Sequence, residues 1–143
     1  MLKFLLALHI LVAIFAVGPL VAAASTAARG VRQGDAAAVA ASARTVRLYG
    51  YVSILVAGLG FGLVQDKWHI AFSDTWVIVS IVLWLVATGL SVLVLAPTLQ
   101  KAGQAIAASQ PAATLTGRVA AVGGLIALSY AVIVFLMVYG PKR

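Results

Sequence analysis

Charged residues divide the chain into four long apolar windows. The uncharged stretches cover residues 4–28, 48–65, 75–100 and 119–141, and no formal charge falls in the middle of any of them. A helix needs ~20 apolar residues to cross a ~30 Å hydrocarbon core, so each window can cross with modest tilt or local adjustment of the bilayer. The pattern therefore predicts an all-α integral membrane bundle of four transmembrane helices.

Capping and helix-breaking residues set the expected helix ends. Asp35 is a suitable N-cap for the alanine-rich run that follows it, and Pro97 cannot continue a helical hydrogen-bond ladder. Ser109-Gln110-Pro111 supplies a cap and an N1 proline, whereas Gly18-Pro19 should bend or interrupt the first helix. The expected helices are 2–24, 36–64, 75–96 and 112–139, with a short helical excursion over 98–110.

Composition agrees with this pattern. The 143 residues are 64% hydrophobic and 9% charged, which is typical of a chain whose solvent is lipid. Four crossings with their connections use the whole length, so we expect one transmembrane domain over residues 1–143 and a location in the cell membrane as a multi-pass protein. There is no cysteine, which excludes a disulfide framework and thiolate metal ligands.

The charges favour one orientation in the bilayer. The net charge is +7, but a basic stripe with interleaved aromatic residues is missing, so we expect no nucleic-acid partner. Four arginines lie in the connection 25–47, where the anionic cytoplasmic leaflet attracts each by about 1 kcal/mol. Six basic residues fall on the side of 25–47 and 97–118 and four on the other, which predicts extracytoplasmic termini. The expected membrane-surface residues are Arg29, Arg32, Arg44 and Arg47.

Small residues are the expected helix-packing surfaces. Lipid gives helices little hydrophobic drive to associate, so close contact depends on small side chains and a few interhelical hydrogen bonds. Gly58 and Gly62 form a small-xxx-small pair in the second window, and Ala120 and Gly124 form another in the fourth. Such pairs do not distinguish packing within the chain from packing against another chain.

Recognisable enzyme chemistry is sparse. No Asp or Glu lies within a membrane window, which counts against an ion-coupled transporter, and there is no HExxH motif or nucleophile elbow. The serines inside the windows have no recognisable base partner in the sequence. We therefore lean against an enzyme.

His9 is the one ionisable side chain at appreciable depth, about two turns into the first helix. An ionisable group at membrane depth is a candidate functional residue, because burying it unpaired is costly. Ala13 and Ala16 follow at i+4 and i+7, so this face can admit another helix or a flat ligand. His69 lies in the hairpin on the same side, and two neutral imidazoles can form an axial pair for haem b or part of a metal site. The alternatives are that His9 bonds a serine or carbonyl and that His69 is interfacial.

The first helix carries a family resemblance. Lys3, Leu8-His9-Ile10 and Gly18-Pro19-Leu20 resemble the first helix of CopD-like and HemJ-like small bacterial membrane proteins, and the whole chain resembles an uncharacterised family of predicted four-helix membrane proteins within that group. The resemblance implies a bacterial inner membrane and associates His9 with haem or metal handling. HemJ-like proteins use a later lysine, yet there is none between Lys67 and Lys101, and the two methionines are few for a copper carrier.

Two readings of function remain at this point. In the first, the protein is a structural or accessory subunit of a membrane assembly, whose small-residue faces pack against a membrane protein partner or a second copy. In the second, it is a haem-binding or redox-linked four-helix bundle that uses His9. The first is favoured, because a functional site needs a constellation of groups and the sequence shows one anchored residue.

Overall fold

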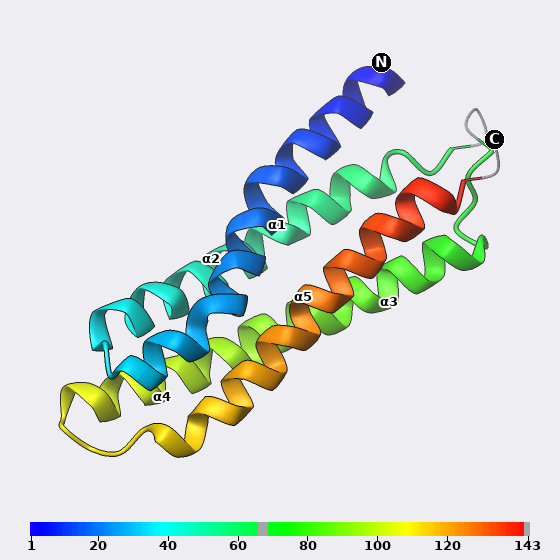
Figure 1. The fold of residues 1–143 in the computed structure, drawn as a ribbon. Helices are drawn as coiled ribbons and strands as arrows, with labels where there is room; N and C mark the ends of the chain where they lie inside the picture. Colours follow the sequence, from blue (N-terminus) through cyan, green and yellow to red (C-terminus); the bar gives the residue numbers. More distant parts are fainter. Residues whose placement is uncertain (66–68, 142–143) are drawn as a thin grey trace.

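A computed structural model describes residues 1–65 and 69–141, which form four long helices in an up-and-down bundle. These are α1 (Leu2–Gln33), α2 (Ala36–Phe61), a third helix that runs from residue 75 to 107, and α5 (Thr116–Tyr139). Both chain termini lie at one end of the bundle (Figure 1). We call this end, with residues 62–65 and 69–74 of the hairpin between α2 and α3, the terminal end. We call the opposite end, with Gly34-Asp35 and the connection 108–112, the basic end.

A two-residue connection joins α1 to α2. Gly34 has φ 64°, and the N–H groups of Gly34 and Asp35 donate to the carbonyls of Val31 and Gly30, which is a Schellman ending. The Asp35 carboxylate then accepts the N–H of Ala38 at 3.0 Å and caps α2. The prediction that Asp35 caps a helix starting at residue 36 is confirmed. The predicted end of the first helix at residue 24 is wrong. The alanines of 22–28 favour the helix, which continues past Gly30 and ends at Gly34, where the positive φ turns the chain.

Pro19 and Pro97 both lie within continuous helices. Pro19 lies inside α1, which continues past it for another fourteen residues without the one N–H that the proline lacks. The third helix passes Pro97 as α3 (Thr75–Gly89), a π-helical segment η2 (Leu90–Leu95) and α4 (Ala96–Ala107), where the expected end was residue 96. Pro97 offers no N–H to the preceding turn, and the wider π turn carries the chain past it. Thr98 Oγ1 donates to the Val94 carbonyl at 2.6 Å and satisfies one nearby acceptor.

The last two helix boundaries also differ from the expected ones. Ser109 has φ 57°, and Gln110 N–H donates to the Ala105 carbonyl at 2.7 Å, so this segment ends α4 and does not cap the following helix. A 3₁₀ turn, η3 (Ala113–Leu115), precedes α5, which starts at residue 116 and not at 112. Likewise α2 ends at Phe61, three residues before the predicted end.

Three helices of the described chain are long and apolar enough to cross a membrane, where four were expected. They are Leu2–Gln33, Thr75–Ala107 and Ala113–Tyr139. α2 falls short because Arg44 and Arg47 lie inside it and its uncharged part, Leu48 to Phe61, is only ~21 Å long at 1.5 Å per residue.

The four helices form a closed ring in which each helix packs against two antiparallel neighbours. α1 packs between α2 and α5, α3 packs on α5, and α4 packs on α2 (Figure 1). The fully buried core is concentrated toward the basic end and the middle of the bundle, where small alanines let the backbones come close. Its largest fully buried side chains are Leu20, Val39, Val46, Leu95, Leu99, Val119 and Ile126.

Candidate functional site

His9 lies in the contact between α1 and α2, with only 6% of its surface exposed. Its Nδ1 is 3.0 Å from the carbonyl oxygen of Val56. A carbonyl only accepts hydrogen bonds, so Nδ1 carries the proton and donates, which fixes the tautomer of the neutral ring. The ring lies against Gly60, where an added Cβ would come within 3.1 Å of His9 Cε1. His9 therefore joins α1 to α2 by both packing and a hydrogen bond.

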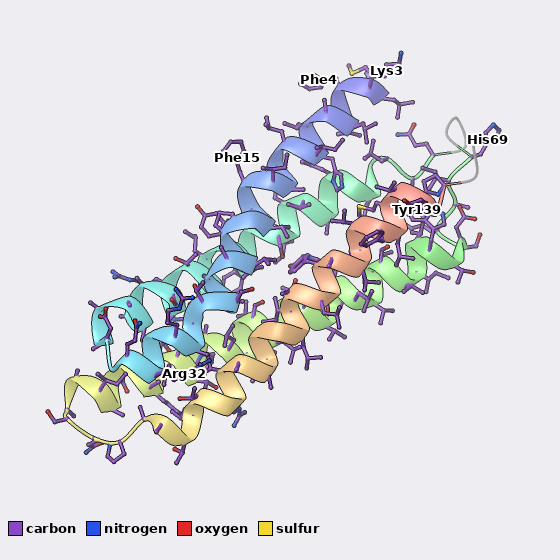
Figure 2. The ribbon with its side chains drawn as sticks, viewed as in Figure 1. Lys3, Phe4, Phe15, Arg32, His69 and Tyr139 are labelled. Atoms are coloured by element: carbon purple, nitrogen blue, oxygen red, sulfur yellow. The ribbon has the colours of Figure 1, made fainter. Side chains whose placement is uncertain are left out.

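The two histidines do not form a shared site in the described chain. His69 is exposed on the hairpin at the terminal end and projects away from the helices (Figure 2). Among the described residues, no three His, Asp or Glu side chains lie close enough to hold a metal ion. Two hollows at the terminal end are not lined by His9; their lining residues are Met1, Leu2, Phe4, Leu5 and Gln65 in one, and Val132, Phe135, Leu136, Tyr139 and Gly140 in the other. Because Nδ1 is used by the Val56 carbonyl, Nε2 is the one His9 ring nitrogen left for a haem or metal.

A second polar contact joins α2 to α3. Ser53 is fully buried, and its hydroxyl donates to the Gly50 carbonyl at 2.7 Å. Because the Ser53 proton is used there, its oxygen accepts from Trp84 Nε1 at 3.1 Å and from Thr88 Oγ1 at 3.2 Å. Within the described residues, this cluster and His9 supply all the side-chain hydrogen bonds between helices. The sequence does not reveal this pairing, because Ser53 lies in a different apolar window from Trp84 and Thr88.

The other buried serines do not connect helices. Ser80, Ser91 and Ser129 each donate to a carbonyl four residues earlier in their own helix, at 2.7 Å. Tyr130 differs, since its residue is 5% exposed and, in the part of the chain that the structure describes, its hydroxyl has no hydrogen-bond partner. A buried unpaired hydroxyl costs about 1–3 kcal/mol.

The small residues predicted to pack helices divide into two groups. A Cβ at Gly62 would meet Leu5 at 3.1 Å, so this glycine lies in the α1–α2 contact. Gly58 and Gly124 are exposed, and a Cβ at either would meet nothing within 4 Å. Ala120 is exposed as well. These three positions therefore do not pack within this chain, and their role in packing stays a prediction about contacts with another chain.

The described chain matches a family model over almost its full length. Residues 3–141 align to the family described as "Predicted integral membrane protein (DUF2269)". The chain belongs to this family. Neither a curated protein nor a solved structure matches it. The family match and the three apolar helices establish a membrane protein, whereas the resemblance of the first helix to CopD-like and HemJ-like proteins is not confirmed.

The predicted membrane-surface residues of this DUF2269 protein gather at the basic end. Each helix carries an exposed basic side chain there, and the one acidic residue at this end, Asp35, is occupied in capping α2. Arg32 lies beside the turn between α1 and α2 (Figure 2). The exposed bases are Arg29, Arg32, Arg44, Arg47, Lys101 and Arg118.

Proposed function

We propose that this protein is an accessory or structural subunit of a membrane assembly, which docks through the outer face of α5. The observation that supports the proposal is a seam of exposed small residues, Gly117, Ala120, Gly124 and Ala131. Their spacing of three, four and seven places them on one side of the helix. A Cβ at Gly117 or Gly124 would meet nothing, so the backbone there is free for close approach by another helix.

The neighbouring helix has a similar surface. Gly18, Ala22 and Ser25 on α1 are exposed at spacings of four and three, and a Cβ at Gly18 would meet nothing within 4 Å. In lipid, small residues on an exposed face favour helix association because they let backbones approach and gain dispersion contacts. Large side chains such as Phe4 and Phe15 cover other parts of α1 and suit acyl chains better (Figure 2).

A bulky residue in the seam tests this function. We expect wild-type protein, extracted in mild detergent, to elute with a stoichiometric companion or as a dimer, and Gly124→Leu to elute alone. The matched control is Leu125→Phe, which adds bulk about 100° around the helix at a position already 53% exposed. Unchanged thermal stability of Gly124→Leu would show that the fold is intact. A wild-type chain that elutes alone, even when extracted within its native lipids, would contradict the proposal.

We also infer that the chain crosses the bacterial inner membrane four times, with its basic end in the cytoplasm. α2 packs antiparallel to α1 and is joined to it by two residues, so it is carried through the bilayer beside α1. Arg44 and Arg47, the ninth and twelfth residues of α2, are exposed, and their long side chains can extend toward the headgroups at the basic end. Six exposed bases at this end fit the cytoplasmic leaflet.

Single cysteines test the orientation, because the native chain has none. Ala108 lies in the connection at the basic end and Ser73 in the hairpin at the terminal end, and both are exposed. A membrane-impermeant maleimide should label Ser73→Cys in intact cells and label Ala108→Cys only after lysis. The reverse labelling pattern would overturn the orientation, and labelling of both sites in intact cells would contradict the four crossings.

A further inference from the structure

The third helix changes partners along its length. α3, toward the terminal end, packs on α5, whereas α4, toward the basic end, packs on α2. The π-helical segment η2 lies between them and contacts both α2 and α5. Figure 1 shows α3 beside α5 and α4 beside the start of α2. The change of partner therefore coincides with the one π-helical stretch in the described residues, a feature that is frequent at functional sites in helices.

Gly50 provides the contact point for this segment on α2. A Cβ at Gly50 would lie 2.8 Å from Val92 Cγ2 and 3.6 Å from Ser91 Cβ, so η2 rests directly on the α2 backbone. Gly50 and Ser91 are both buried. Just beyond this contact, toward the terminal end, Ser53 accepts the hydrogen bonds of Trp84 and Thr88. Among the described residues these are the side-chain hydrogen bonds that hold the α1–α2 pair to the α3–α5 pair.

Apart from this cluster, the two pairs meet mainly where α1 packs on α5, around Ala24 and Gly123. α2 and α3 touch over only a short stretch. Met137 continues the buried face of Tyr130 and Ile133, at i+7 and i+4, yet it is 42% exposed. Phe61 continues the face of Gly50 and Ser53 and is also 42% exposed. Positions that point inward by helical spacing are thus uncovered at the terminal end.

Each pair is held together internally. His9 bonds and packs α1 to α2, as described above. α5 ends against α3, where a Cβ at Gly140 would overlap the Trp76 ring. The buried Tyr130 hydroxyl of α5, the helix that contacts η2, has no hydrogen-bond partner in the described structure. A second conformation in which water or another side chain bonds this hydroxyl would remove the free-energy cost of leaving it unpaired.

We propose that η2 on Gly50 is a hinge and that Ser53, Trp84 and Thr88 form its latch. When the latch opens, the α1–α2 and α3–α5 pairs rock apart at the terminal end, and the apolar interior between them opens sideways to the hydrocarbon of the bilayer. The hinge belongs to the class in which a short helical irregularity absorbs the motion of two rigid bodies. It does not depend on the accessory role of α5, because its parts face the interior of the bundle.

Distances between paired spin labels test the hinge in the full chain reconstituted in lipid vesicles. Gly58→Cys on α2 and Val82→Cys on α3 report across the two pairs, and Ala40→Cys with Gln104→Cys reports between α2 and α4 at the basic end; all four positions are exposed. We expect the 58–82 distances to be broad and the 40–104 distances to be narrow. Ser53→Ala, which removes the latch hydroxyl, should shift the 58–82 population to distances longer by roughly 5 Å, the scale of a one-turn rearrangement.

Trp84→Phe is the second variant, since it keeps an aromatic ring in place and removes one donor to Ser53. It should produce a smaller shift in the same direction. A narrow 58–82 distribution that stays the same in wild type and in both variants would overturn the hinge. Equal broadening of the 40–104 distances in the variants would also overturn it, because that result means general loosening of the bundle and not rotation about η2.

Discussion

Gly123→Ala is expected to separate α1 from α5 and to be among the most damaging single substitutions in this chain. An added Cβ at Gly123 would fall on the carbonyl group of Ala24, so even one methyl group has no room without a backbone shift. Overpacking of a closely packed site costs about 1–3 kcal/mol. We expect a loss of that size in the free energy of unfolding, measured by circular dichroism during a denaturing-detergent titration.

The next residue is the matched control. A Cβ at Gly124 would meet nothing within 4 Å, so Gly124→Ala should leave the unfolding free energy unchanged or slightly higher, since alanine favours the helix. The pair of variants has the same chemistry and differs only in the face of α5 on which the methyl group lies. Equal destabilisation by both substitutions would mean that α5 is rotated relative to the arrangement described above.

His9→Ala is expected to loosen α1 from α2 by a similar or larger amount. The substitution removes the hydrogen bond to the Val56 carbonyl and leaves a cavity over Gly60. Large buried side chains cut to alanine lose about 2–5 kcal/mol, and the hydrogen bond contributes about 0.6 kcal/mol of this in a membrane setting. The measurement is again the free energy of unfolding in detergent.

His69→Ala provides the control for this experiment. His69 is exposed on the hairpin, so its removal should not change stability. The absorption spectrum of protein produced with added haem separates the two roles considered for His9. A Soret band that is present in wild type and lost in His9→Ala, with the unfolding free energy unchanged, would make His9 a haem ligand and would refute the packing role.

Local rules predicted the parts of the fold that depend on a few adjacent residues. The start of α2 at residue 36 follows from the cap Asp35, α3 starts at the expected residue 75, and α5 ends at Tyr139, just before Gly140-Pro141. Pro97 was misjudged as a helix end because the π-helical segment before it, which lies against Gly50, carries the helix past the proline. That contact joins two windows and has no signature in either one alone.

The candidate site shows the same division. His9 was identified from the sequence because an ionisable residue in an apolar window is rare. Its partner is a main-chain carbonyl, which every residue possesses, so no residue type marks Val56. The pairing of Ser53 with Trp84 likewise depends on the relative heights of α2 and α3, which are set by packing across the bundle.

The ring order of the helices has a consequence for biosynthesis. The first and last helices of the chain are neighbours, and the α1 backbone at Ala24 is covered by Gly123 of α5. During synthesis the α1–α2 hairpin is complete long before α5 leaves the ribosome, so one side of α1 must wait in lipid or against a chaperone until the final helix inserts. A nascent chain stopped after Ala107 would therefore hold a formed hairpin and an open ring, and closure of the bundle is the last step of its assembly.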